Sequence, residues 1–220
     1  MNDTPPTRCR LVLAAPAGAD RASLAARIAD ACAGGDVASL ILPQYGLDDA
    51  AFQALAEAVV APAQAQGVAV MIAGEPRIAA RTGADGVHAE GGRAALADLI
   101  DRYQPKMMVG AGGAKDRDAA LELGELRPDY LFFGRFGYDT KTEPHARNLA
   151  LGRWWSEMVE IPCLVLGGAT VESVADVAAT GAEFVVLSTA VFGEGVDATA
   201  AVAQANRILD ETAPAFETAS

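Results

Sequence analysis

The feature that most constrains this chain is a regular alternation of short apolar runs with longer, Ala-rich amphipathic segments. The runs are rich in Val, Ile, Leu and Met and are expected to be strands, at residues 11–15, 37–42, 68–72, 86–88, 107–110, 130–133, 163–166 and 184–187. The other segments are expected to be helices, at residues 21–32, 48–66, 76–81, 93–103, 116–123, 149–158, 171–180 and 198–211. Such alternation is typical of βα units that build a parallel sheet. Eight units predict an α/β fold, the (β/α)8 TIM barrel.

A single domain is expected, because 220 residues suit one TIM barrel and no linker-like composition divides the chain. We place the barrel core at about residues 10–211 and expect flexible ends at 1–9 and 212–220. The alternative is an open, doubly wound sheet. Its GxGxxG nucleotide fingerprint is absent after the first strand, where residues 13–18 contain one glycine. We therefore favour the barrel.

A short motif recurs before several expected strands. Thr-Gly-Ala-Asp at 82–85 returns as Thr-Gly-Ala-Glu at 180–183, and Gly34, Gly35 and Asp36 form a looser copy. Glycine can end a helix in the left-handed conformation and turn the chain into the next strand. We interpret the repeat as a set of αβ turns at the face of the barrel that serves stability rather than chemistry.

Charge and cysteine content exclude several classes of protein. The formal net charge is −12, which disfavours nucleic-acid binding because phosphate backbones recruit clustered Lys and Arg. Cys9, Cys32 and Cys163 lack the CxxC spacing of a metal or redox site and predict no disulfide framework. No signal peptide is recognisable, and no stretch has the roughly 18 uninterrupted apolar residues of a membrane span. We expect a cytoplasmic protein that binds neither nucleic acid nor membrane.

The ends of the last two expected strands carry the most specific local signal. Gly167 and Gly168 follow the seventh strand and lead into a helix, while Ser188 and Thr189 follow the eighth. Glycine lets backbone amides approach an oxyanion, and TIM barrels commonly hold a phosphate in these two loops. The alternative is that the glycines form only a tight turn and Thr170 only a helix cap. Two half-sites at consecutive strand ends favour a phosphate-binding site.

Five segments of the chain resemble the thiamine phosphate synthase/TenI family. They are GADGVH at 83–88, DYLFFG at 129–134, Thr-Lys-Thr at 140–142, LVLGGAT at 164–170 and VVLSTAVF at 185–192. The resemblance implies a TIM barrel that binds a phosphorylated small molecule. It also implies a reaction that joins a pyrimidine diphosphate to a thiazole phosphate, with Mg²⁺ stabilising the departing diphosphate.

The positions that serve the family reaction differ in this chain. The Gln-x-Arg-x-Lys pattern after the second strand is missing from residues 39–44. The two aspartates that bind magnesium in the family are also missing, and Glu75 and Glu90 are the nearest carboxylates, so they are the candidate metal ligands. The Ser and His that follow the fifth strand in the family fall at Gly112 and Ala114. Mg²⁺ is therefore a weakly supported cofactor.

Other polar residues stand at the same strand ends and are candidates for catalysis. His88 lies near Glu90, and such a pair can act as general acid or base near neutral pH; a purely structural histidine is the alternative. Arg135 and Lys141, in the segment after the sixth strand, would bind a second phosphate or would be a solvated pair. Further polar groups at these ends are Gln44, Tyr45, Arg77, Lys115, Tyr138 and Asp139.

Two functions remain in competition. One is a degenerate paralogue that holds a thiazole phosphate or thiamine phosphate with weak or no synthase activity. The other is an active, Mg²⁺-dependent thiamine phosphate synthase that uses substitute residues. A Schiff-base aldolase is disfavoured, because none of Lys106, Lys115 and Lys141 lies in the middle of an expected strand. A second copy of the chain, in a homodimer, is left open as a partner.

Overall fold

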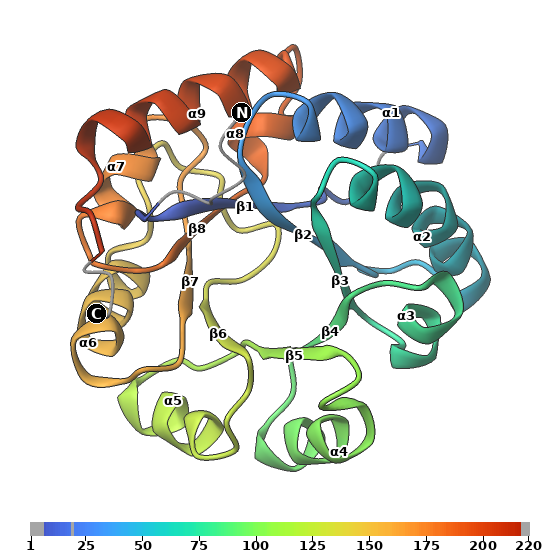
Figure 1. Cartoon of the computed structure of the whole chain (residues 1–220), viewed down its shortest axis with the longest axis horizontal. Coiled ribbons are helices and arrows are strands. Elements are labelled where there is room, and N and C mark those ends of the chain that lie inside the picture. The colour runs from blue at the N-terminus through green and yellow to red at the C-terminus, as the bar shows by residue number, and fades with distance from the viewer. Residues whose placement is uncertain (1–6, 19, 217–220) are drawn as a thin grey trace.

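The computed structural model describes residues 7–18 and 20–216 and contains a closed, eight-stranded parallel barrel. The strands follow one another around the ring in chain order (Figure 1). They are β1 (Arg10–Ala14), β2 (Val37–Pro43), β3 (Ala69–Ala73), β4 (Gly86–Ala89), β5 (Met108–Ala111), β6 (Tyr130–Phe133), β7 (Cys163–Leu166) and β8 (Phe184–Leu187). Pairing of β8 with β1, in register from Arg10 opposite Phe184 to Leu13 opposite Leu187, closes the ring. The predicted TIM barrel is confirmed.

The helices form an outer layer around the strands (Figure 1). They are α1 (Arg21–Cys32), α2 (Asp49–Gln64), α3 (Pro76–Thr82), α4 (Arg93–Tyr103), α5 (Arg117–Gly124), α6 (Ala146–Met158), α7 (Ser173–Ala178), α8 (Thr189–Phe192) and α9 (Ala198–Thr212). Four begin at an aspartate whose side chain accepts the amide three residues on: Asp20, Asp48, Asp116 and Asp197. This bond satisfies an amide that the helix leaves free. Among the described residues, no helix is both long and apolar enough to cross a membrane.

The helices differ most from the sequence prediction at two places. Helix α6 begins at Ala146, earlier than residue 149, because the His145 side chain accepts the amide of Arg147 and caps this end. Helix α8 was not predicted. It is a single turn after β8, in which the carbonyl of Ser188 accepts the amides of Val191 and Phe192. Only four residues long, it is too short to produce a periodic pattern.

The strands separate two apolar layers. In β1, Leu11 and Leu13 pack outward against the helices, whereas Val12 and Ala14 point into the barrel. Aromatic rings fill much of the interior, including Tyr130, Phe132 and Phe136. Glycine is needed opposite Tyr130, because a Cβ at Gly110 would overlap the phenol ring. The interior is therefore a packed core rather than a pore.

The recurring motif before β4 and β8 lies at the N-terminal end of the barrel, as predicted. Gly83 and Gly181 have φ of +70° and +85° and turn the chain from helix to strand. Gly34 differs, because the left-handed residue of that turn is Gly35, while Gly34 lies so close to α9 that a Cβ would stand 2.9 Å from the Val202 Cβ. Glycine is thus required at these turns for two separate reasons.

An acidic residue directly before each of β4, β6 and β8 has a structural role that the sequence did not reveal. Each carboxylate accepts the amide of a residue at or near the start of the neighbouring strand. The pairs are Asp85 with Val70 (2.7 Å), Asp129 with Val109 (2.6 Å) and Glu183 with Cys163 (2.9 Å). Charge-assisted bonds of this kind join β4 to β3, β6 to β5 and β8 to β7 at the rim.

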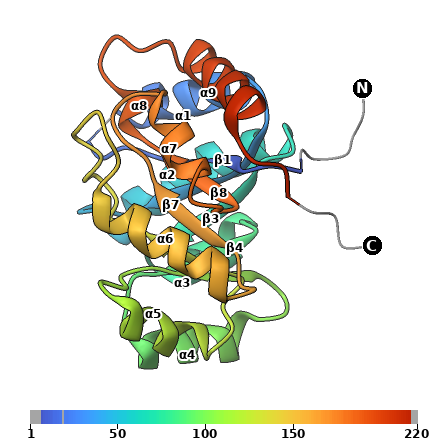
Figure 2. The same cartoon turned by 90° about the vertical axis from the view of Figure 1, so that its left-hand side faces the viewer.

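The two described ends of the chain meet at the same N-terminal end of the barrel. Arg8 forms a β-bridge with Ala215, and its side chain pairs with Asp210. In Figure 2 these ends lie opposite the loop between β6 and α6, drawn in yellow. The expected flexibility of residues 1–9 and 212–220 stays a prediction, and residues 1–6 and 217–220 lie outside the described part of the chain.

Replacing Asp85 with alanine should lower the free energy of unfolding by about 1–3 kcal/mol, because the buried Val70 amide would lose its acceptor. Asp98→Ala is the matched control, since this exposed aspartate has Arg102, one helical turn away, as its one ion-pair partner among the described residues, and it should cost about 0.5 kcal/mol or less. Urea unfolding of both variants measures the difference. Equal costs would contradict the proposed role of the Asp85 carboxylate.

Candidate functional site

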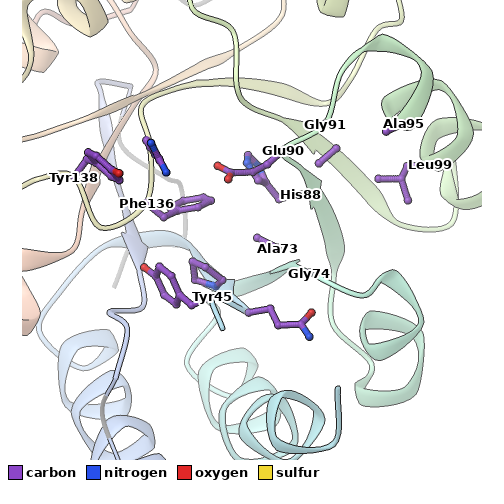
Figure 3. Close-up of a pocket in the computed structure, with 14 residues that line it drawn as sticks. Tyr45, Ala73, Gly74, His88, Glu90, Gly91, Ala95, Leu99, Phe136 and Tyr138 are labelled. Carbon is purple, nitrogen blue, oxygen red and sulfur yellow. The ribbon is translucent and has the colours of Figure 1, made fainter. Parts of the chain in front are cut away.

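The βα loops at the C-terminal ends of the strands surround two adjoining cavities. The first, about 620 Å³, is the aromatic cavity, lined by residues that include Tyr45, His88, Glu90, Arg135, Phe136 and Tyr138. Figure 3 shows five of these side chains around the open space: Tyr45, His88, Glu90, Phe136 and Tyr138. The second, about 590 Å³, is the loop cavity, lined by residues that include Arg135, Asp139, Lys141, Arg147, Leu166 and Gly167. Arg135 and Tyr138 line both cavities, so the two spaces adjoin at this pair.

The loop between β6 and α6, residues 134–145, supplies walls of both cavities and runs over the mouth of the barrel towards β8 and β1 (Figure 1). The Arg135 guanidinium lies 4.0 Å from the centre of the exposed Tyr138 ring, a cation–π contact. On the opposite wall, Tyr45 adopts a left-handed backbone with φ of +47°. Its hydroxyl donates to the carbonyl of Ala15 at 2.9 Å, which holds the ring at the cavity wall. Burial raises the pKa of Tyr45 to about 12, so this donor keeps its proton.

His88 lies at the inner wall of the aromatic cavity, on β4. Its side chain is buried, with 4% of its surface exposed, and its Nδ1 lies 2.9 Å from the hydroxyl of Tyr130. Its Nε2 is buried and has no hydrogen-bond partner among the described residues. Burial lowers the pKa of His88 to about 3, so the imidazole is neutral at physiological pH. This disfavours the expected acid–base role. In the alternative, structural role, only one of the two ring nitrogens has a hydrogen-bond partner.

The two candidate metal ligands differ in position. Glu90 lines the aromatic cavity, where burial raises the pKa of its carboxyl and the Arg135 guanidinium opposes that shift. Glu75 is not among the residues that line the cavity; it caps α3, and its Oε1 lies 2.7 Å from the Nε of Arg77. Hydrogen bonding from Arg77 lowers the pKa of Glu75. Across the described residues, no three His, Cys, Asp or Glu side chains gather in a metal-binding arrangement. Glu90 alone is a poor donor set for Mg²⁺.

The backbone amides of the expected phosphate site already have partners. The Gly168 amide donates to the Ser173 hydroxyl at 2.9 Å, and the Ala169 amide donates to the carbonyl of Lys141 at 2.7 Å. Gly168 has no room for a side chain, because a Cβ would overlap the backbone of Thr142. The β6–α6 loop is therefore packed directly on the end of β7.

At the end of β8 the partner is a carboxylate. The amide of Thr189 donates to Asp139 Oδ2 at 2.6 Å. Asp139 is buried, with 3% of its surface exposed, and its Oδ1 has no hydrogen-bond partner among the described residues. No Lys, Arg or His in the described part of the chain forms an ion pair with it. A buried carboxyl oxygen without a hydrogen-bond partner is costly, so Asp139 is only partly satisfied at this position.

The structure brings most of the predicted site residues to one end of the barrel. Gly167, Lys141 and Arg135 line the loop cavity, whereas His88 and Glu90 line the aromatic cavity. Three cationic side chains face the loop cavity: Arg135, Lys141 and Arg147. Ser188 is buried and precedes α8 as its N-cap residue.

Sequence reasoning missed the roles of Asp139 and Tyr130. Asp139 was noted only as one polar group among several, and Tyr130 only as part of a strand. Their partners, Thr189 and His88, are 50 and 42 residues away in the chain. The glycine opposite the Tyr130 ring, Gly110, was the one local signal, because an unexplained glycine inside a strand indicates a close approach.

Comparisons with known proteins found similar sequences and a similar fold. A model of the family described as thiamine monophosphate synthase, TMP-TENI, matches residues 11–191. The thiamine-phosphate synthase of Rhodospirillum centenum is 34% identical to this chain. The alignment covers 92% of this chain and 99% of that relative. That of Hyphomonas neptunium is 32% identical, with 97% of this chain and 100% of the relative covered. Among solved structures, a thiamine phosphate pyrophosphorylase from Pyrococcus furiosus has a TM-score of 0.75 at 20% identity and shares the fold, over 92% of this chain and 96% of that one.

Acid should destabilise the protein through His88. The imidazole has a pKa of about 3 when folded and 6.5 as the unperturbed value, so below pH 6.5 the unfolded chain binds the extra proton. The stability that the neutral His88 imidazole contributes is fully present above pH 6.5 and is lost as the pH falls towards 3. The free energy of unfolding, measured with urea between pH 7 and pH 4.5, should fall more steeply with decreasing pH in the wild type than in His88→Gln. The difference should be up to about 1.4 kcal/mol per pH unit. Equal pH dependence of the free energy of unfolding in the wild type and in His88→Gln would contradict the prediction.

Proposed function

The chain belongs to the thiamine monophosphate synthase family, and from this premise we propose that it binds a phosphorylated small molecule, a thiazole phosphate or thiamine phosphate, with weak or no magnesium-dependent synthase activity. The observation that carries the proposal is the Asp139 carboxylate on the Thr189 amide at the end of β8. TIM barrels commonly hold a phosphate at the ends of strands seven and eight. A carboxylate of the protein itself at that place marks the amide as an anion-binding group.

The ligand phosphate would take the place of the Asp139 carboxylate. It carries more negative charge and more acceptor oxygens than a carboxylate, and Arg135 and Lys141 line the adjoining cavity as counter-ions. Asp139 has no ion-pair partner among the described residues, so its displacement towards solvent would relieve a buried charge. Binding therefore requires movement of the β6–α6 loop away from β8.

Weak synthase activity follows from the donor set. Loss of a diphosphate develops negative charge, which metal ions and cations must meet in the transition state. Glu75 is engaged with Arg77, which leaves Glu90 as the candidate carboxylate in the aromatic cavity. An active synthase is the second candidate, because relatives up to 34% identical carry that name. In that case Glu90, Arg135 and Lys141 would serve as substitutes. Cytoplasmic location and a homodimer remain predictions.

Asp139→Ala should bind thiazole phosphate more tightly than the wild type. A hydrogen bond to a charged group contributes about 1.5–3 kcal/mol, so removal of this competitor should tighten binding about tenfold or more. Asp139→Asn keeps an acceptor without the charge and should fall in between. Titration calorimetry measures all three affinities.

Glu143→Ala is the matched control, because Glu143 is an exposed carboxylate of the same loop that also lines the loop cavity. It should change the affinity by no more than about threefold, since exposed charges are screened. A loss of affinity in Asp139→Ala would mean that Asp139 binds the ligand instead of competing with it. That result would overturn the proposed phosphate position.

A coupled assay with the pyrimidine diphosphate, the thiazole phosphate and Mg²⁺ separates the two candidate functions. We expect turnover far below the ordinary range, because the cationic and carboxylate groups that meet a departing diphosphate are reduced; losing one such group can cost about 10²–10³ in rate. Turnover of about 1 s⁻¹ or more, lost in Glu90→Gln, would instead establish the active synthase.

A further inference from the structure

The β6–α6 loop is attached to the barrel at two places, which leave residues 137–140 between them. On one side the Phe136 ring is buried and stacks on Phe132, with ring centres 4.9 Å apart. On the other side the carbonyl of Lys141 accepts the Ala169 amide at 2.7 Å, and the chain that follows packs on the end of β7. The loop therefore has two fixed ends and a short span between them.

Residues 137–140, called the flap below, have few bonds to the rest of the protein. Three of the four residues are exposed, whereas Asp139 is buried. The backbone amide of Tyr138 donates to the carbonyl of Arg135 in the same turn, at 3.2 Å. In the described part of the chain, the one hydrogen bond that joins the flap to another element is that of the Thr189 amide to Asp139, at 2.6 Å. This single contact holds the flap against the end of β8.

The flap stands where the two cavities adjoin. Tyr138 lines both the aromatic cavity and the loop cavity, and Figure 3 shows it at one edge of the aromatic cavity. Its ring is 62% exposed, so core packing does not hold it in place. The Arg135 guanidinium, 4.0 Å from the ring centre, lines the same two cavities. Outward movement of the flap would remove Tyr138 from this boundary and join the two spaces.

We propose that the flap is a gate between the two cavities, and that the Asp139 carboxylate on the Thr189 amide is the latch that keeps it closed. Gly137 is the hinge, because it directly follows the buried Phe136 and its φ of +76° is one that glycine adopts and leaves without strain. The contact is autoinhibitory, since a carboxylate of the protein itself closes the passage between the cavities. The inference rests on the proposed function for the anion that displaces the latch, whereas the latch can be tested without a ligand.

Fluorine NMR of protein labelled with 3-fluorotyrosine tests the latch. The chain has four tyrosines, and Tyr138→Phe identifies the Tyr138 signal. Asp139→Ala, which deletes the latch, should shift this signal without any ligand, and saturating inorganic phosphate should shift the wild-type signal in the same direction. Glu143→Ala, which removes an exposed carboxylate of the same loop, should leave it unchanged. The signal of Tyr103, which lines neither cavity, should stay in place throughout.

Gly137→Ala tests the hinge. A Cβ at this position has room, since the nearest atom, Cε1 of Tyr45, would lie 3.9 Å away, so the substitution strains only the left-handed backbone of the closed gate. The variant should shift the Tyr138 signal as Asp139→Ala does and bind inorganic phosphate about 5–30-fold more tightly, the range that a left-handed non-glycine residue corresponds to. Gly195→Ala is the matched control, because Gly195 has φ of +72° in open space and lines neither cavity. It should leave the signal unchanged and the phosphate affinity within about twofold, measured by titration calorimetry.

Two results would overturn the inference: a Tyr138 signal in Asp139→Ala that equals the wild-type signal, or phosphate binding in Gly137→Ala that is unchanged or weaker. If Gly137→Ala fails to fold, the signals of Asp139→Ala and of the phosphate-bound wild type still decide the question. Failure of phosphate to bind, with the Tyr138 signal shifted in Asp139→Ala, would count against the proposed phosphate position and not against the gate. Tighter phosphate binding in Asp139→Ala with an unshifted Tyr138 signal would support that position and refute the gate.

Discussion

Pairing of β8 with β1 is the constraint on which the rest of this molecule depends. Once the sheet is closed, all eight C-terminal strand ends meet at one rim, and groups far apart in the chain become neighbours. The end of β8 comes to lie beside the loop that follows β6, which lets Asp139 reach the Thr189 amide. At the other rim, carboxylates such as Asp85 bind amides of adjacent strands. Closure therefore separates a structural end from a functional end.

Inside the barrel, packing sets the protonation state of a side chain that lines the aromatic cavity. Gly110 leaves room for the Tyr130 ring, which brings the phenol under His88. The burial that stabilises this core also lowers the pKa of His88 to about 3. A group that titrates near neutrality in water thus stays uncharged in this interior, and such surroundings do not favour proton transfer.

At the rim, the site contains a buried carboxyl group of the protein itself, that of Asp139. One of its two oxygens has no hydrogen-bond partner among the described residues, which is an unfavourable contribution to the packing of the β6–α6 loop. The adjoining cavity supplies three cations, Arg135, Lys141 and Arg147, that would compensate an incoming anion. The same loop contributes Phe136 and Tyr138 to the aromatic cavity. Movement at Asp139 would therefore be felt in both cavities, because one short segment forms walls of each.

The sequence by itself determined the barrel, because eight apolar runs and the helices between them carry periodicities that act over a few residues. It also located the strand-end glycines and the family motifs, since these are local signals. It did not determine three side-chain contacts: the ion pair of Glu75 with Arg77, the hydrogen bond between Tyr130 and His88, and the hydrogen bond of the Thr189 amide to Asp139. The last two contacts join residues 42 and 50 positions apart, and they exist only after the sheet has closed. Tertiary structure decided them, because side-chain partners and burial depend on which strand ends become neighbours.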